Sequence, residues 1–97
     1  MKATRIFYDK AVLPDGFIVE MVICQLPTSS AERPHGLKYR LYFGRNGQRM
    51  VGYDNERGKG DHKHILDVEK SYKFTTAEKL VADFLYDIER FQNEQGK

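Results

Sequence analysis

The strongest constraint on the fold is a hairpin signature between residues 37 and 54. Apolar or aromatic side chains alternate with basic or polar ones over residues 37–43, which is the period of a strand with one buried face. Asn46-Gly47 follows, a pair typical of a tight turn between antiparallel strands. Residues 48–54 supply the returning strand. Depending on its register, the predicted hairpin brings together three side chains: Arg40, Arg49 and Tyr53.

Two more strands are predicted before this hairpin. Residues 4–9 form a short strand, and Pro14-Asp15-Gly16 has the composition of a turn. The strand over residues 17–26 begins with an apolar run that only Glu20 interrupts. Such a run is typical of a central strand that is covered on at least part of both faces.

The segments that flank the hairpin region are less regular. Residues 27–36 contain two prolines, a glycine and several hydroxyl side chains, which predicts a long loop. His35 lies in this loop, and we expect it to be solvated. Residues 62–69 have an ambiguous pattern with strand character, and residues 72–74 are predicted to form a short strand.

A helix is predicted at the C-terminal end. Thr75 and Glu78 have the spacing of a capping box, and apolar residues then recur at intervals of three and four. The helix is expected to end near residues 93–96. The chain is therefore predicted to be a single α+β domain over residues 1–97, with an antiparallel meander of four to six strands and one C-terminal helix packed on it. One helix cannot cover a broad sheet, so an exposed face or edge is a candidate surface for a homodimer or another partner.

Composition narrows the functional classes. The chain has 97 residues, a net charge of +2 and a pI near 8.7, which is too mildly basic to indicate nucleic-acid binding by itself. Its one cysteine, Cys24, excludes an intramolecular disulfide and lies in an apolar run. No apolar run approaches the roughly 20 residues that cross a bilayer, and no secretory signal pattern is present. We therefore expect a cytoplasmic protein without membrane contact.

The stretch over residues 53–64 is the candidate functional segment. Gly58 and Gly60 flank Lys59, and such a turn can present backbone N–H groups to an anion beside a lysine charge. His62 and His64 are two residues apart, so in an extended segment both point to the same face. A solvated, flexible loop rich in charge is the alternative interpretation.

Several motifs in this order resemble the TumE family of small toxin–antitoxin proteins. They are the opening residues 2–9, Tyr39-Arg40-Leu41, Tyr53-Asp54-Asn55 and Gly60-Asp61-His62-Lys63-His64. The resemblance spans nearly the whole chain, and its most specific part is the Gly-Asp-His-x-His element. It implies a prokaryotic toxin that is paired with a helix-turn-helix antitoxin.

RNA cleavage without a metal is the chemistry that we predict for such a toxin. It needs a base for the 2′-hydroxyl, an acid for the leaving oxygen and cations for the charge that develops on the phosphate. Histidine suits both proton transfers because its unperturbed pKa is near 6.5, and Asp61 or Asp54 could orient an imidazole. The predicted catalytic residues are His62, His64, Lys59 and Asp61, and the predicted substrate-binding residues are Arg40, Arg49, Tyr53, Arg57 and Lys63.

Other interpretations of the same segment stay open. Asp61, His62 and His64 could bind a metal, but one acidic residue beside a His-x-His pair is a weak signal, so no metal and no cofactor is predicted. A binding module would use the same cations without turnover, and it could bind a nucleic acid or a protein. In a structural role, both histidines would bond backbone carbonyls. Asp83 and Asp87 are four residues apart on the predicted helix, and such acids are more often solvated.

Overall fold

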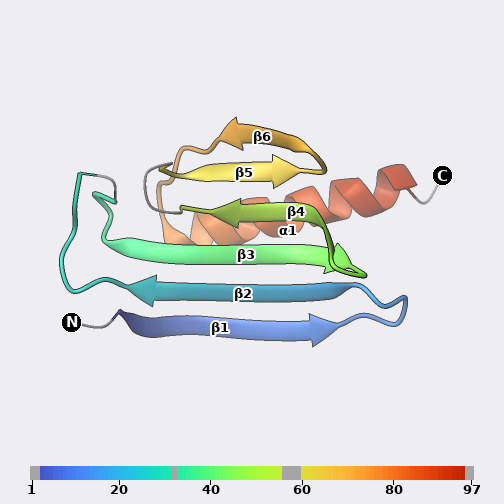
Figure 1. The fold of residues 1–97 in the computed structure, drawn as a ribbon, viewed down its shortest axis with the longest axis horizontal. Helices are drawn as coiled ribbons and strands as arrows, with labels where there is room; N and C mark the ends of the chain where they lie inside the picture. The colour runs from blue at the N-terminus through green and yellow to red at the C-terminus, as the bar shows by residue number, and fades with distance from the viewer. Residues whose placement is uncertain (1–2, 32, 56–59, 96–97) are drawn as a thin grey trace.

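The computed structural model describes residues 3–31, 33–55 and 60–95. Within these residues, six antiparallel strands form one sheet in the order β1-β2-β3-β4-β5-β6, and one helix lies against it (Figure 1). The predicted α+β meander with a C-terminal helix is thereby confirmed. The elements are β1 (Thr4–Val12), β2 (Ile18–Gln25), β3 (Leu37–Arg45), β4 (Gln48–Asp54), β5 (His62–Ile65), β6 (Val68–Ser71) and α1 (Ala77–Gln95).

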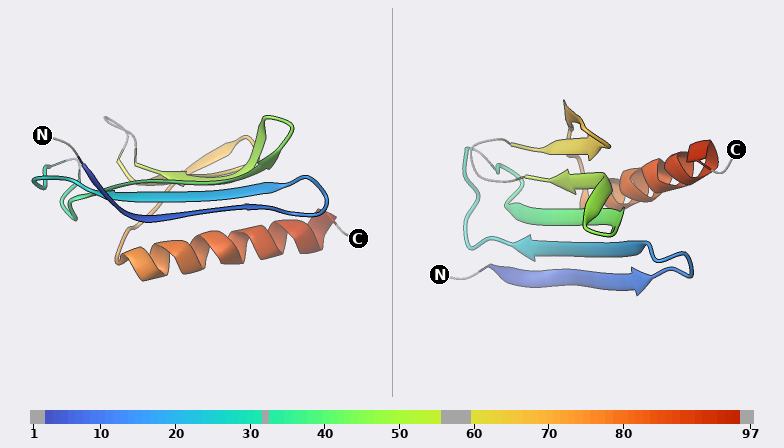
Figure 2. Two further views of the ribbon diagram at one scale, coloured as in Figure 1. Left: turned by 90° about the horizontal axis from the view of Figure 1, so that it is seen from below. Right: turned by 45° about the vertical axis from the view of Figure 1, so that its right-hand side comes forward.

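The helix covers one face of the sheet and leaves the other uncovered (Figure 2). We call these the helix face and the open face. Alternate side chains of β3 and β4 point to the helix face, where Leu41 lies opposite Tyr53 and Phe43 lies opposite Val51. All four are buried. The core that they form with the helix and β2 consists of Phe17, Met21, Ile23, Tyr39, Leu41, Phe43, Val51, Tyr53, Leu80, Phe84, Ile88 and Phe91.

The predicted turns form as the sequence indicates. Asn46 and Gly47 both have positive φ, 56° and 76°, which the tight turn between β3 and β4 requires. Gly16 has a φ of 88°, and its N–H donates to the Leu13 carbonyl at 2.9 Å in the turn between β1 and β2. These two turns set the registers that determine which side chains share a face.

The helix begins one residue later than predicted. The backbone N–H of Lys79 donates to the Thr76 hydroxyl oxygen at 3.0 Å, so Thr76 rather than Thr75 is the N-cap. The two threonines are adjacent, and the capping-box spacing favoured the wrong one. Within the described residues, no helix is long and apolar enough to span a membrane.

The last strand also differs from its prediction. Leu66 has a φ of 54° and belongs to the turn that joins β5 to β6, so the final strand lies at Val68–Ser71 rather than at residues 72–74. Tyr72 and Phe74 leave the sheet and pack on the helix face. The ring of Tyr72 meets Tyr53 edge-on, with centroids 4.9 Å apart.

Candidate functional site

The sheet separates the predicted site residues into two groups. Cross-strand pairing places Arg40 opposite Asp54 and Asp54 opposite His62. His64 lies two residues further along β5, opposite Gly52. These side chains are on the open face because Tyr53, which alternates with them, is buried under the helix. Of the residues predicted from sequence, the open face brings together Arg40, Arg49, His62 and His64, and the helix face takes Tyr53, Asp61 and Lys63.

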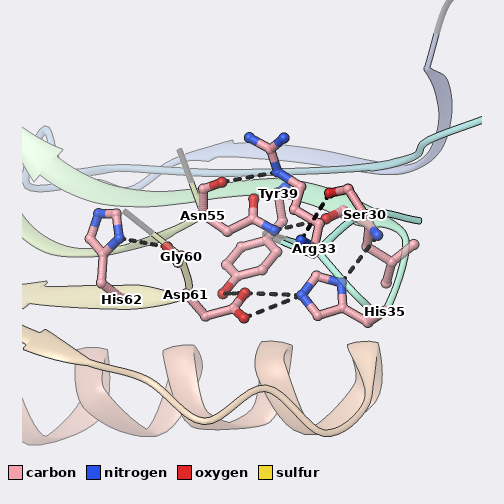
Figure 3. A network of polar contacts seen from close by, with 9 residues as sticks. Ser30, Arg33, His35, Tyr39, Asn55, Gly60, Asp61 and His62 are labelled. Atoms are coloured by element: carbon pink, nitrogen blue, oxygen red, sulfur yellow. Dashed lines mark hydrogen bonds and ion pairs between the residues drawn. The ribbon is translucent and has the colours of Figure 1, made fainter. Parts of the chain in front are cut away.

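His62 is a fixed, buried ring. Its Nε2 atom lies 2.7 Å from Asp54 Oδ1, and its Nδ1 atom lies 3.0 Å from the Gly60 carbonyl oxygen (Figure 3). Only 4% of the residue is exposed. Each ring nitrogen is thus within hydrogen-bond distance of an oxygen atom, one on Asp54 and one on Gly60. His62 is thereby held between the end of β4 and the start of β5.

His64 is the more accessible of the two rings. Its centroid lies 5.0 Å from that of His62, with the ring planes at 80°, and its Nε2 atom lies 3.5 Å from Glu69 Oε1. Burial lowers the pKa of His64 below its ordinary value, and the charges of Arg49 and His62 act in the same direction. The ring is therefore neutral at pH 7 and can accept a proton.

Arg49 supplies an unused hydrogen-bond donor beside these rings. Its Nε atom is buried and has no hydrogen-bond partner within the described part of the chain. A buried donor without a partner costs about 1–3 kcal/mol, a cost that a bound oxyanion would remove. The side chain occupies space that only a glycine at position 52 leaves open, because a Cβ atom there would stand 2.5 Å from Arg49 Cδ.

A metal is the other group that this cluster could hold. Asp54, His62 and His64 each offer a ligand atom, and these atoms lie within 4.8 Å of one another. The carboxylate in this set is Asp54, whereas the sequence pointed to Asp61. The cationic Arg49 opposes a metal beside His64, since like charges at short range repel.

Asp61 belongs to a separate cluster on the helix face. Figure 3 shows its carboxylate turned toward His35 and Tyr39, away from the His62 ring. The Tyr39 hydroxyl donates to Asp61 Oδ1 at 2.8 Å, and His35 Nε2 lies 3.1 Å from the same oxygen. Burial, followed by this hydrogen bond, raises the pKa of Tyr39. In this position Asp61 ties the loop before β3 to the start of β5.

His35 is therefore not the solvated loop histidine that we expected. Its Nδ1 atom accepts the backbone N–H of Leu37 at 3.1 Å, which leaves the hydrogen on Nε2 for Asp61. Its ring lies on Phe74, with centroids 4.0 Å apart. Sequence spacing gives no sign of this contact, because Asp61 is 26 residues away.

Lys63 and Tyr53 meet the helix instead of the open face. Lys63 Nζ lies 3.2 Å from Asp87 Oδ2, and the Tyr53 hydroxyl donates to the same carboxylate. Asp83 accepts from Tyr72 at 2.6 Å and from Lys79 at 2.6 Å. Burial opposes its ionisation, but these two bonds prevail and lower the pKa of Asp83. Asp87 thus fastens α1 to the sheet, and Asp83 bonds the segment before the helix and Lys79 of the helix itself.

Two predicted cations, Arg57 and Lys59, lie outside the described residues.

Two residues on the open face, Tyr42 and Glu69, were not among the predicted site residues. The Arg40 guanidinium lies 5.8 Å from the centroid of the Tyr42 ring, and Glu69 lies opposite His64. The alternation of β3 already placed Tyr42 beside Arg40, so this signal was available, whereas Glu69 depends on a turn that the sequence left ambiguous.

Comparison with protein families identifies one match. The family model described as Toxin TumE matches residues 2–92. Comparisons with curated proteins and with solved structures gave no significant match.

Proposed function

The chain belongs to the TumE family of toxins, and from this premise we propose that it cleaves RNA on the open face of its sheet. The observation that carries the proposal is that a neutral imidazole, His64, lies beside the buried Nε–H of Arg49, which has no hydrogen-bond partner among the residues that the structure describes. One group accepts a proton and the other binds an oxyanion. These are two of the requirements for attack of a 2′-hydroxyl on its own phosphate.

The reaction is an internal displacement at phosphorus. His64 removes the proton from the 2′-hydroxyl, the freed oxygen forms a bond to phosphorus, and the bond from phosphorus to the 5′ oxygen breaks. That oxygen takes a proton from water, and the products are a 2′,3′-cyclic phosphate and a 5′-hydroxyl. Arg49 and Arg40 bind the phosphate oxygens as charge develops on them. No step uses a metal.

His62 acts as a positioning residue in this proposal. Its ring nitrogens are already engaged by Asp54 and the Gly60 carbonyl, and the rings of His62 and His64 are too close to stand on opposite sides of one phosphate. The ring of His62 packs edge-on against that of His64 and holds it in place. Lys59 and Arg57, which precede Gly60 in the chain, are proposed to add phosphate contacts.

The partners of the proposed toxin follow from its family. A toxin family implies a cognate antitoxin, and we propose that this antitoxin is a helix-turn-helix protein. We also propose that the toxin acts in the cytoplasm. Strand β1 forms one edge of the sheet, and all of its residues are exposed. This supports a homodimer in which β1 pairs with its counterpart in a second copy.

The direct test is incubation of the purified chain with a single-stranded RNA in excess EDTA. We expect cleavage with 2′,3′-cyclic phosphate ends and no cleavage of the all-deoxy oligonucleotide. A chain that binds RNA without turnover would instead be the binding module considered above. Loss of cleavage in EDTA, restored by a divalent metal, would assign Asp54, His62 and His64 to a metal site.

The pH dependence of cleavage is expected to follow His64. A base must be unprotonated, so kcat/KM is expected to fall as pH decreases through the lowered pKa of His64 and to be level at neutral pH. Arg49→Gln removes a charge that lowers this pKa, so the midpoint is expected to move to higher pH. An unchanged midpoint in Arg49→Gln would exclude His64 as the titrating base.

Gly52→Ala is expected to reduce cleavage about 10- to 100-fold, because the new methyl group displaces Arg49 and removes one oxyanion donor, a loss worth up to about 10²–10³ in rate. The control is Gly52→Ala in an Arg49→Ala background, where the substitution is expected to add little. Equal effects in both backgrounds would show that Gly52 acts independently of Arg49.

A further inference from the structure

Apart from Arg40, the basic and aromatic side chains on the open face of the first three strands take no part in the proposed chemistry at His64. We propose that this surface binds single-stranded RNA, which crosses β1, β2 and β3 and reaches the phosphate site at His64. This proposal deepens the proposed function and rests on it for the identity of the nucleic acid. We call the surface the β1–β3 track and define it by Arg5, Tyr8, Lys10, Lys38, Arg40 and Tyr42.

The register of the sheet aligns the track with the histidines. Tyr8 lies opposite Val22 and Val22 opposite Arg40, in the same cross-strand row that continues to Asp54 and His62. The next row runs from Lys10 through Tyr42 to His64. Four strand spacings of about 4.8 Å separate the ends of each row, a span of roughly 19 Å. Several nucleotides of an extended strand would cover it.

The aromatic side chains of the track are arranged for stacking. Tyr8 is 44% exposed, and the guanidinium of Arg5 lies 4.9 Å from its ring centroid. Tyr42 has Arg40 beside it in the same way, at 5.8 Å. Tyrosine rings and arginine planes are the surfaces on which unpaired bases stack. The two tyrosines lie on neighbouring rows of one sheet face.

The charge of the track is complementary to a phosphate backbone. Its four cations, Arg5, Lys10, Lys38 and Arg40, are all exposed. In β1, β2 and β3, which are described completely, the register places one acid on this face, Glu20. The Tyr8 hydroxyl donates to Glu20 at 3.1 Å, so this carboxylate also orients the ring. This excess of positive charge attracts the phosphates of RNA, whereas a protein segment with few acidic residues would gain nothing from it.

A single strand fits this surface better than a duplex. The bases of a duplex are paired and stacked on one another, so their faces cannot stack on Tyr8 and Tyr42. The attack by a 2′-hydroxyl also needs its oxygen in line with the leaving oxygen, and the regular A-form backbone does not provide that alignment. The proposed ligand is therefore a flexible, unpaired strand with contacts to backbone and to base faces.

The test measures the affinity of the full chain for a labelled 2′-O-methyl oligonucleotide, which has no 2′-hydroxyl to react. Tyr8→Ala is expected to weaken binding about 5- to 100-fold, the range for one lost base-stacking contact, and Tyr8→Phe is expected to retain it. Glu20→Gln is expected to tighten binding. Tyr86→Ala is the matched control: Tyr86 is 59% exposed on α1, with Arg90 6.0 Å from its ring, and it lies away from the track.

The proposed binding surface would be contradicted if Tyr8→Ala and Tyr86→Ala bound the oligonucleotide with equal affinity. It would also be contradicted if the wild type bound the duplex as tightly as the single strand. Cleavage of a dinucleotide separates the track from the proposed function, because a dinucleotide cannot reach from His64 to Tyr8. Tyr8→Ala is expected to cleave it at the wild-type rate. If the chain binds the long strand through Tyr8 but cleaves neither that strand nor the dinucleotide, the β1–β3 track is supported and the proposal that the chain cleaves RNA is wrong.

Discussion

His64→Ala is expected to lower RNA cleavage by about 10²–10⁴-fold, the usual contribution of a positioned base, and to abolish the growth arrest caused by the toxin. His64 is the half-buried ring whose pKa is lowered by burial, Arg49 and His62, so it is neutral and able to accept a proton at pH 7. The rate is measured on a purified variant whose folding is verified by circular dichroism.

His35→Gln is the matched control for this prediction. It also removes an imidazole, but from the helix face, where the ring bonds Asp61 and Leu37. We expect a lower Tm and an unchanged cleavage rate at temperatures where the variant is folded. A folded His64→Ala variant that cleaves RNA at the wild-type rate would remove His64 from the mechanism.

Phe84→Ala is expected to destabilise the protein by about 3–5 kcal/mol, the usual cost of removing a buried phenylalanine ring. Phe84 is fully buried in the middle of α1, and its ring centroid lies 5.9 Å from that of Tyr53 in an edge-on contact. Small domains have about 5–15 kcal/mol of stability in total, so the variant is expected to be partly unfolded at 37 °C. Urea denaturation measures the free energy of unfolding.

The adjacent Leu85 provides the comparison. It is 46% exposed on the same helix, so Leu85→Ala is expected to change the free energy of unfolding by about 0.5 kcal/mol or less. Comparable losses in the two variants would contradict the orientation of α1 on the sheet.

The fold was predictable because its signals are local. The alternation over residues 37–43 and the Asn46-Gly47 turn specify the central hairpin, and the apolar stripe specifies the helix. Errors arose where neighbouring residues have similar propensities. Thr75 and Thr76 can each cap a helix, and only packing selects Thr76. The β6 boundary depends on Leu66 in a left-handed conformation, which the residue type does not indicate.

The site was less predictable because it depends on which face each side chain occupies. Spacing alone placed His62 and His64 together, and the two rings are in contact. The same parity puts Asp61 and Lys63 on the opposite face, so a run of consecutive polar residues is divided by the sheet. The contact of His62 with Asp54 required the β4–β5 register, and the arrangement of Arg49 over Gly52 required the irregular pairing near Gly44.

The most direct test of the central claim is a titration of the protein with a 2′-O-methyl RNA, followed by NMR of the histidine rings and the arginine Nε–H groups. If the open face binds the phosphate, the signals of His64 and the Arg49 Nε–H will shift and saturate together, while His35 on the helix face stays unchanged. A shift of His35 without any change at His64 and Arg49 would place the RNA on the other side of the sheet and contradict the account.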